Sequence, residues 1–520
     1  MAEIELLHVT FLLSFFLFVY KFVILPRQRK PKNLPPGPRA LPVIGHLHLL
    51  RDPVFRALDE VSQQYGPVLF LQLGNRKVLV VSSLSIAQEC FTKNDIVFAS
   101  RPHLLAGEHL QYNSTTVPLA TYGDHWRSLR RLITVEILSA YRVAMFSGIR
   151  EEEVMLLTKQ LWESSPGAGW TKVDVKTKLT ELAFNGILAT ITGKRYFGRD
   201  VADIEEAREF QRIFKEYTVL HGNSMLGDYL PIMRWFDFKG VEKGMKRAMK
   251  KMDAFFVSLI EEQRRVRGKS GASSNDDAAG GHGMKKKRTL IDEMLQLQEV
   301  EPELYTDQII KGIVLTMLTA ATETSSTSME WAMGLLLNHP EAIQKARAEI
   351  ETHVGLDRVV EEQDLPKLAY LQNIINETIR LYPALPLALP HEASADCTVA
   401  GYDVPRGTML LTNLWAIHRD PKLWDRPREF VPERFEGKEG ERRANLMIPF
   451  SAGRRICPGA SLARKVMGLT LAVFIQCFDW KRVGPEKVDL TEGSGITMPM
   501  ARPLEAMYKP RSATEKLLHV

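Results

Sequence analysis

The segment from Pro449 to Ala460, PFSAGRRICPGA, restricts the fold more than any other part of this 520-residue chain. It holds Cys457 between Gly453 and Gly459, and glycine allows turns and close approaches that a side chain would block. Pro458 suits the first turn of a helix that begins near Gly459, and the positive end of such a helix stabilises an anionic sulfur. These residue types favour a loop that presents a thiolate to the iron of a haem.

The other cysteines have no such surroundings. Cys90, Cys397 and Cys477 are interpreted as buried, inert thiols, the usual state of a lone cysteine. No two of the four cysteines have zinc or redox spacing, and so few thiols in so long a chain argue against a disulfide scaffold. A hydrophobic content of 45% indicates a core large enough to enclose a cofactor, whereas a net charge of +6 gives no case for nucleic acid as a partner.

A membrane anchor is predicted at the N-terminus. The run from Leu6 to Leu25 is almost wholly apolar, and about 20 helical residues span the bilayer core. A cleaved signal peptide is the alternative, but it would have a basic start, and here Glu3 and Glu5 precede the run. The basic residues follow it, which places the remaining chain in the cytoplasm. We expect an anchor over residues 1–26 and a basic, proline-rich hinge over residues 27–47.

Local patterns in the body predict mainly helices. Residues 69–82 read as a hairpin that turns at Gly74-Asn75, and residues 268–288 read as an exposed flexible loop. Thr306 and Asp307 start a helix that continues to about Asn338. Six hydroxyl residues crowd its middle between positions 322 and 328, which indicates a site that needs polar groups inside a buried helix.

The cysteine segment also matches a family pattern. Phe450, Gly453, Arg455, Cys457 and Gly459 fit F-x-x-G-x-R-x-C-x-G at every fixed position, and the chain resembles the cytochrome P450 family over nearly its whole length. The resemblance implies a mainly α fold with small β-sheets, preceded by a single transmembrane helix, with residues 48–520 as the haem-binding catalytic domain. It also implies haem b as the cofactor, with Cys457 as the axial thiolate ligand of the iron.

The same resemblance supplies further residues of the haem pocket. Trp126 and Arg130 match W-x-x-x-R, whose side chains approach a haem propionate, although a surface arginine beside a core tryptophan is the plainer interpretation. His391 occupies a position that often has the same role. The expected cofactor-binding residues are Cys457, Trp126, Arg130, Arg455, His391, Phe450 and Gly459.

A structural support for the pocket is expected from two distant segments. Glu377 and Arg380 match E-x-x-R, and Pro432-Glu433-Arg434-Phe435 follows at the family's distance. A helical i, i+3 ion pair alone would mean little. In the family Glu377, Arg380 and Arg434 join the two segments, with no chemical role.

The crowded helix carries the expected oxygen-activation residues. Residues 320–325, AATETS, resemble A/G-G-x-D/E-T-T/S, in which Thr324 and Glu323 relay protons to dioxygen. The alternative is that Thr324 only bonds back to its own helix. Two departures stand out, because Ala321 replaces the usual glycine and Ser451 stands where plant members often carry glycine.

Electrons are expected from a partner protein. No G-x-G-x-x-G follows a strand, so NADPH and flavins would act only through an NADPH–cytochrome P450 reductase. Basic residues flank the segments that should cover the cysteine side of the haem, and part of them would dock that reductase while the rest are solvated. They are Arg127, Arg130, Arg131, Arg454, Arg455, Arg464 and Lys465.

Substrate contacts are expected in four mostly apolar stretches, residues 103–117, 315–320, 384–389 and 496–498, with Ala320, Leu385, Ala388 and Ile496 as candidates. The finer resemblance is to a plant group that includes isoflavone 2'-hydroxylases. It implies an enzyme of the endoplasmic reticulum membrane that hydroxylates a small flavonoid- or isoflavonoid-like phenolic with O2. The alternatives are oxidative coupling or ring closure, as from benzophenone to xanthone, methylenedioxy-bridge formation, a haem-thiolate isomerase or dehydratase, and a membrane-anchored haem protein without turnover.

Overall fold

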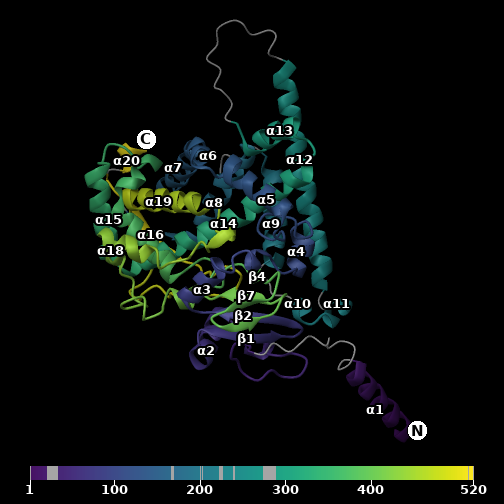
Figure 1. The fold of residues 1–520 in the computed structure, drawn as a ribbon. Coiled ribbons are helices and arrows are strands. Elements are labelled where there is room, and N and C mark those ends of the chain that lie inside the picture. Colours follow the sequence, from purple (N-terminus) through teal and green to yellow (C-terminus); the bar gives the residue numbers. More distant parts are fainter. Residues whose placement is uncertain are drawn as a thin grey trace.

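Helices form most of the body, and the largest sheet lies at the end of the body nearer the N-terminal helix (Figure 1). The structure, a computed structural model, describes residues 2–19, 33–165, 169–198, 201, 203–221, 226–237, 240–272, 288–512 and 514–518. The expected mainly α fold with small sheets is confirmed.

The helices of the described residues are α1 (Ala2–Val19), α2 (Val54–Tyr65), α3 (Leu84–Phe91), α4 (Leu105–Leu110), α5 (Asp124–Arg131), α6 (Ala140–Met145), α7 (Ser147–Glu163), α8 (Val175–Thr192), α9 (Ile204–His221), α10 (Leu226–Tyr229), α11 (Ile232–Phe236), α12 (Val241–Ala272), α13 (Leu290–Val300), α14 (Asp307–Asn338), α15 (Pro340–His353), α16 (Ala369–Leu381), α17 (Leu414–Ile417), α18 (Gly437–Ala444), α19 (Ala460–Cys477) and α20 (Thr514–Leu517). A π-helical segment, η4 (Leu132–Ile137), continues α5.

The predicted long helix is α14, and its ends agree with the sequence prediction. The Thr306 hydroxyl accepts a hydrogen bond from the Ile309 N–H at 3.4 Å, which caps the first turn. Residues 310–318 pack into one apolar cluster and residues 329–337 into another. The middle of α14 lies between these clusters, so the body holds this helix firmly on either side of its polar segment.

The hydroxyl groups in the middle of α14 bond back to their own helix. Thr322 donates to the Leu318 carbonyl at 2.7 Å, Thr324 to the Ala320 carbonyl at 2.6 Å, and Ser328 to the Thr324 carbonyl at 2.8 Å. Such bonds compete with the helix ladder but satisfy the hydroxyls without an outside partner.

The four-stranded sheet has the order β1-β2-β7-β4. β1 (Val68–Leu73) and β2 (Arg76–Val81) form the predicted hairpin, and its turn contains Gly74 at φ +55°. β7 (Met409–Thr412) runs parallel to β2 and pairs antiparallel with β4 (His391–Glu392). A three-stranded sheet contains β3 (Thr171–Asp174), β9 (Glu505–Pro510) and β8 (Phe478–Lys481), and β5 (Cys397–Val399) pairs with β6 (Tyr402–Val404).

The described part of the predicted hinge packs against the body. The Phe70 N–H donates to the Pro36 carbonyl at 3.0 Å, and the His46 N–H donates to the Gln72 carbonyl at 2.6 Å. Asn33 donates its side-chain amide to the Gly401 carbonyl at 2.9 Å. Residues 33–47 therefore follow the edge of the sheet instead of forming a free spacer.

The predicted anchor lies only partly within the described residues. In α1 the side chains of Val9, Phe11 and Phe16 are 53%, 70% and 68% exposed, and Figure 1 shows this helix apart from the body. Residues 20–32 lie outside the described part. Among the described residues, α19 is the only helix long and apolar enough to cross a membrane, but 61% of it is buried in the body.

The predicted loop at residues 268–288 needs one correction. Residues 268–272 continue α12, which ends at Ala272, because the helix period extends further than the glycine at 268 suggests. Residues 273–287 lie outside the described residues.

Candidate active site

A cavity of about 240 Å³ lies between the middle of α14, the α5–η4 segment and the loop before α19. Most of the predicted site residues line it. They are Trp126, Arg130, Ala320, Thr324, Leu385, Ala388, Phe450, Arg455, Cys457 and Gly459. Glu323, His391 and Ile496 are not among the residues that line it.

The loop that carries Cys457 is shaped by its glycines. Gly453 has φ +68°, and a Cβ atom there would lie 2.4 Å from the Asp95 carboxylate and 2.8 Å from the Phe91 carbonyl. The chain can therefore pass α3 only with glycine at this position. The Cys457 N–H donates to the Phe450 carbonyl at 2.9 Å, which closes the loop.

Cys457 lines the cavity, and its side chain is exposed there. The surrounding protein raises the pKa of its thiol above the ordinary value by desolvation, while the Gly459 N–H and the Arg130 guanidinium act in the opposite direction. Gly459 is the N-cap of α19, so the helix begins as predicted and Pro458 precedes the cap instead of occupying the first turn. None of the other three cysteines lines this cavity, and burial raises the pKa of Cys477 to about 12.

Three arginines surround the cavity, and their charges are not balanced by the described residues. Arg101, Arg130 and Arg455 line it, and none of them forms an ion pair with a described carboxylate. Burial, together with the neighbouring Arg455, lowers the pKa of Arg101 to about 9, and burial with the neighbouring Arg130 lowers that of Arg455 to about 9. Buried like charges are costly unless an anion lies among them.

Arg101 is a site residue that sequence reasoning missed. It donates to the carbonyls of Pro118, Leu389 and Pro390 at 3.0, 2.8 and 2.7 Å, and so ties two walls of the cavity together. The sequence feature that could have identified Arg101 is its place among mostly apolar residues in VFASRPHLLAG. A charged residue in such a stretch is rarely buried without a partner.

Arg455 and Trp126 form one unit on the cavity wall. The Arg455 guanidinium carbon lies 4.3 Å from the centre of the Trp126 ring, and its Nε donates to the Ala99 carbonyl at 2.6 Å. The Trp126 Nε1 donates to the Val117 carbonyl at 3.2 Å. The stacking holds the guanidinium rigidly at the cavity.

His391 lies near Arg101 and Arg455 but does not line the cavity. Its Nδ1 bonds to the Phe98 carbonyl at 2.7 Å, and its buried Nε2 has no hydrogen-bond partner among the described residues. Burial, then the nearby Arg101, lower its pKa well below the ordinary value, so the ring is neutral. Donation from Nδ1 leaves Nε2 as an acceptor, and only a nearby anion that raised this pKa would turn it into a donor.

The two expected relay residues face different surroundings. Thr324 lines the cavity, whereas the Glu323 carboxylate accepts a hydrogen bond from the Thr497 hydroxyl at 2.7 Å. Consecutive helix residues point about 100° apart, and here Glu323 is directed to Thr497 and not to the cavity. Ile496, next to Thr497, is 39% exposed, away from its expected place in the cavity.

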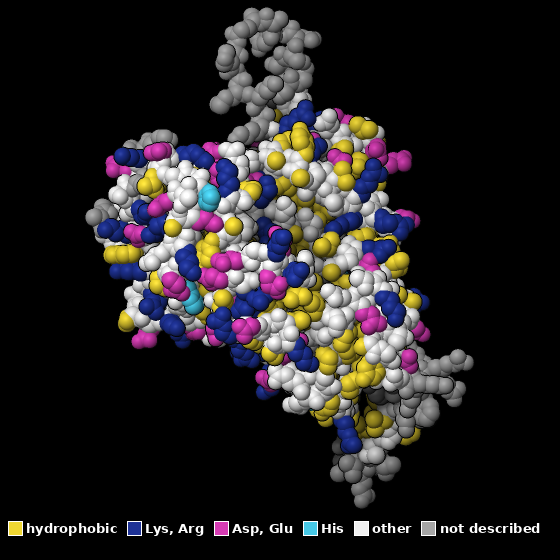
Figure 2. Space-filling model, turned by 60° about the vertical axis from the view of Figure 1, so that its left-hand side comes forward, with side chains coloured by type: hydrophobic (Ala, Val, Ile, Leu, Met, Phe, Trp, Pro, Cys, Tyr) yellow, Lys and Arg dark blue, Asp and Glu magenta, His cyan; other side chains and the backbone are white. Residues whose placement is uncertain are grey.

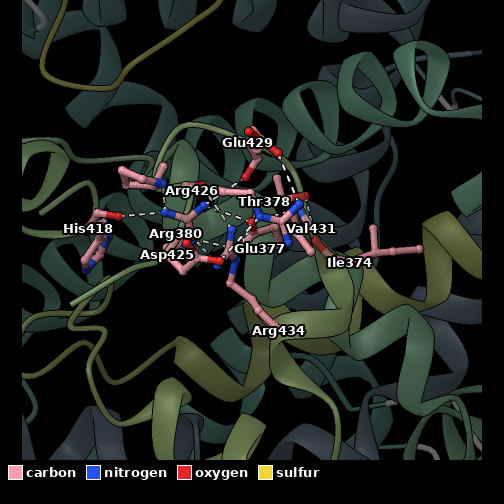
Figure 3. Close-up of polar contacts among 11 residues, drawn as sticks. Ile374, Glu377, Thr378, Arg380, His418, Asp425, Arg426, Glu429, Val431 and Arg434 are labelled. Atoms are coloured by element: carbon pink, nitrogen blue, oxygen red, sulfur yellow. Dashed lines mark hydrogen bonds and ion pairs between the residues drawn. The ribbon is translucent and has the colours of Figure 1, made fainter. Parts of the chain in front are cut away.

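Glu377, Arg380 and Arg434 meet in a buried network (Figure 3). Glu377 accepts from Arg380 at 2.6 and 2.8 Å and from the Arg434 Nε at 2.9 Å. Arg380 also donates to the His418 carbonyl at 2.7 Å. The network joins α16 to η7 (Pro432–Phe435) and to the chain between residues 418 and 434.

These residues fit a haem. The cavity offers a thiol on a glycine-shaped loop, three cations that lack a described counter-charge, and mostly apolar walls with a few hydroxyl groups. A haem presents an iron, two carboxylates and a large apolar ring, so each group would meet its complement.

Comparison with known proteins agrees with this geometry. The family model for cytochrome P450 matches residues 35–504, and the chain belongs to the cytochrome P450 family. Similar plant proteins include cytochrome P450 81Q32 of Catharanthus roseus, 53% identical over 95% of both chains. An isoflavone 3'-hydroxylase of Medicago truncatula is 47% identical over 95% of this chain and 96% of its own. A (+)-piperitol/(+)-sesamin synthase of Sesamum radiatum is 45% identical over 99% of both.

Membership of this family defines the cofactor and the class of reaction. The protein is a monooxygenase that uses haem b with an axial cysteine thiolate, and its electrons come from NADPH through a reductase.

The basic residues expected to face that reductase fall into three groups. Arg130 and Arg455 line the cavity. Arg464 donates to Asn376 at 2.6 Å, and Lys465 pairs with Glu362 at 2.5 Å. Arg127, Arg131 and Arg454 reach the surface, where Arg127 pairs with Asp124 and Arg454 with Asp95. On the face drawn in Figure 2, basic and acidic side chains are interspersed, so a docking surface must be assigned from particular residues.

Proposed function

We propose that Cys457 ligates the haem iron and that the enzyme hydroxylates a plant phenolic of flavonoid or isoflavonoid type. The observation that carries the proposal is the cavity itself, which brings the Cys457 sulfur and the Thr324 hydroxyl into one enclosure with mostly apolar walls. Relatives of this chain are named as isoflavone hydroxylases.

The walls suit a flat aromatic substrate. Ala320, Leu385 and Ala388 contribute small or apolar side chains to the cavity that Thr324 lines, and Leu414 adds another apolar side chain. Ala388 has φ +56°, a conformation that costs energy for a residue with a side chain, and strained residues often occur at binding sites. An apolar pocket with few polar groups binds an aromatic ring by burial and shape.

The residues around the cavity would have two roles, binding of the haem and transfer of protons. Arg101, Arg130 and Arg455 would hold the haem carboxylates, with Trp126 fixing Arg455, and His391 would join them once a nearby carboxylate raises the pKa of its ring enough for the ring to take up a proton. The bound haem supplies the iron that activates dioxygen. The Thr324 hydroxyl would pass a proton into the cavity, and Glu323, held by Thr497, would supply it from outside.

An anchored location is part of the proposal. The exposed apolar side chains of α1 need an apolar surrounding, and the packed residues 33–47 would set the angle between the anchor and the body. We infer that the protein is held at the endoplasmic reticulum membrane with its catalytic domain, residues 48–520, in the cytosol.

The test uses membranes that contain this protein and a plant reductase, supplied with NADPH and a panel of isoflavones, flavones, lignans and benzophenones. Products are identified by mass spectrometry. A product heavier by one oxygen atom establishes hydroxylation and the substrate class. Conversion of none of these phenolics, by a preparation that shows the thiolate-type carbon monoxide spectrum, would refute the proposed substrate class.

The second candidate is oxidation without net oxygen insertion, such as ring closure. It is favoured by one observation, that a relative at 45% identity is named a synthase and not a hydroxylase. A product lighter by two hydrogen atoms in the same assay would establish it.

A further inference from the structure

A second, smaller cavity of about 60 Å³ lies beside the large one, between α7, α8, α14 and α19. The two cavities share five lining side chains, those of Leu138, Met317, Ala321, Ser325 and Leu462. These shared side chains lie between the small cavity and the cavity that Cys457 and Thr324 line. Cys457, Phe450 and the three arginines do not line the small cavity.

The small cavity offers no charge to a ligand. Arg150 donates to Glu362 at 2.7 Å, and Glu153 forms an ion pair with Arg195 at 2.7 Å, so both lining charges are paired. The Thr190 hydroxyl donates to the Gly186 carbonyl at 2.8 Å. The other polar residue, Ser325, lies on the wall shared with the large cavity, and the remaining lining is apolar. Cavities of this kind stay dry and accept small apolar molecules.

Gly186 keeps part of this space open. It lies in the interior of α8 and lines the cavity, and a Cβ atom placed there meets nothing within 4 Å. Alanine would fit and is a better helix former than glycine. Gly186 therefore leaves open a space that the methyl group of alanine would fill, although alanine would make the helix more stable.

We propose that this cavity is a holding site for dioxygen, with Met317 and Ala321 forming the gate to the haem cavity. Dioxygen is small and apolar, and the monooxygenase reaction consumes it. An engineered apolar cavity of about 150 Å³ binds benzene or xenon, so a space of about 60 Å³ is too small for a flavonoid-sized substrate and suits a diatomic gas. Ala321, which stands where the family usually has glycine, narrows the passage. The proposal depends on the family's use of dioxygen and not on which phenolic is oxidised.

The first test uses xenon as the probe, with the haem-loaded protein crystallised and pressurised with the gas. Wild-type protein should show a xenon atom among Gly186, Met317 and Leu462. Gly186→Leu should abolish that site. The matched control is Gly268→Leu, because Gly268 is also a helical glycine whose Cβ would meet nothing within 4 Å, but it is exposed on α12. No xenon in the small cavity of the wild type, or binding that survives Gly186→Leu, overturns the proposal.

The second test measures how fast the reduced, substrate-loaded protein binds dioxygen in a stopped-flow instrument. Gly186→Leu should slow this association several-fold and raise the KM for dioxygen, whereas Gly268→Leu should match the wild type. If Gly186→Leu fails to hold haem, Gly186→Ala gives the same comparison with a smaller effect. An unchanged association rate in a variant that has lost the xenon site would show that dioxygen does not use this cavity.

Discussion

At the scale of single residues, the cysteine loop holds Ser451 in a left-handed backbone conformation that is unfavourable for a residue with a side chain. Ser451 has φ +62°, and its buried hydroxyl has no hydrogen-bond partner among the described residues. The left-handed region costs a residue with a side chain about 1–2 kcal/mol. A hydrogen bond from the Ser451 N–H to the Ile448 carbonyl at 2.9 Å nevertheless stabilises the turn. The turn leads the chain into the loop that places Cys457 at the cavity.

Ser451→Gly should therefore stabilise the haem-loaded protein by about 1 kcal/mol, since relief of strain exceeds the added freedom of the unfolded chain. The measurement is the midpoint of thermal unfolding. Ser451→Ala is the control, because it removes the hydroxyl but keeps the Cβ atom. A lower midpoint for Ser451→Gly and Ser451→Ala alike would mean that the hydroxyl has a stabilising partner in the loaded protein.

The arginines show what residue patterns could and could not predict. Arg130 and Arg455 were found because each stands at a fixed spacing from Trp126 or Cys457. Arg101 was missed because its partners lie up to 289 residues away, at Pro118, Leu389 and Pro390. Local spacing determines neighbours along a helix or loop, whereas packing decides which distant carbonyls a buried guanidinium meets.

At the scale of elements, α16 and η7 are joined by one buried carboxylate. Glu377 is fully buried and accepts hydrogen bonds from Arg380, Arg434 and the Val431 N–H, all at 3.0 Å or less. Removal of one partner leaves buried charge uncompensated.

Glu377→Gln should lower the free energy of unfolding by about 3–5 kcal/mol. A large part of the variant protein should fail to retain haem. Glu429→Gln is the matched control, because Glu429 lies in the same network region but its side chain is 59% exposed. Loss of the Glu429 charge should lower the free energy of unfolding by less than about 1 kcal/mol. Haem content and unfolding midpoint are measured for both, and equal losses in the two variants would contradict the account.

The middle of α14 is the second element with a specific prediction. Thr324→Val removes the one hydroxyl of the proposed relay that lines the cavity and preserves shape. Product formation should fall about 100-fold or more, while NADPH oxidation continues and the reduced oxygen appears as hydrogen peroxide. Thr322→Val is the control, because Thr322 bonds to Leu318 and does not line the cavity. Full product yield from Thr324→Val would remove Thr324 from the relay.

The ends of α14 and the β1–β2 hairpin were predictable, because a cap, a proline or a glycine turn marks each of them. The direction of Glu323 was not, because it depends on Thr497, which lies 174 residues later in the chain. Ile496 was misplaced for the same reason, since distant residues hold the chain beside it: the Met498 N–H donates to the Ala384 carbonyl at 2.9 Å, and the Trp331 Nε1 donates to the Met498 carbonyl at 2.7 Å.

At the scale of the whole molecule, delivery of electrons requires a surface that receives the reductase on the cysteine side of the haem. Arg131 lies exposed at the end of α5, close in sequence to the cavity residue Arg130. Charge at the rim of an interface acts mainly on association and is screened by salt.

Arg131→Glu should raise the reductase concentration needed for half-maximal turnover several-fold at low ionic strength, and the difference should shrink as salt is added. Arg442→Glu, at an 82% exposed side chain on α18, is the control and should leave this concentration unchanged. An effect of Arg131→Glu that persists undiminished at high salt would argue against electrostatic docking there.

The central claim is that Cys457 supplies the thiolate in a cavity built to hold haem. The direct test is the carbon monoxide difference spectrum of the reduced protein, compared between wild type and Cys457→Ser, with Cys477→Ser as a control. The account predicts a thiolate-type Soret band in the wild type and in Cys477→Ser, and its loss in Cys457→Ser. Survival of that band without Cys457 would show that another residue ligates the iron, and the assignment of the site would be wrong.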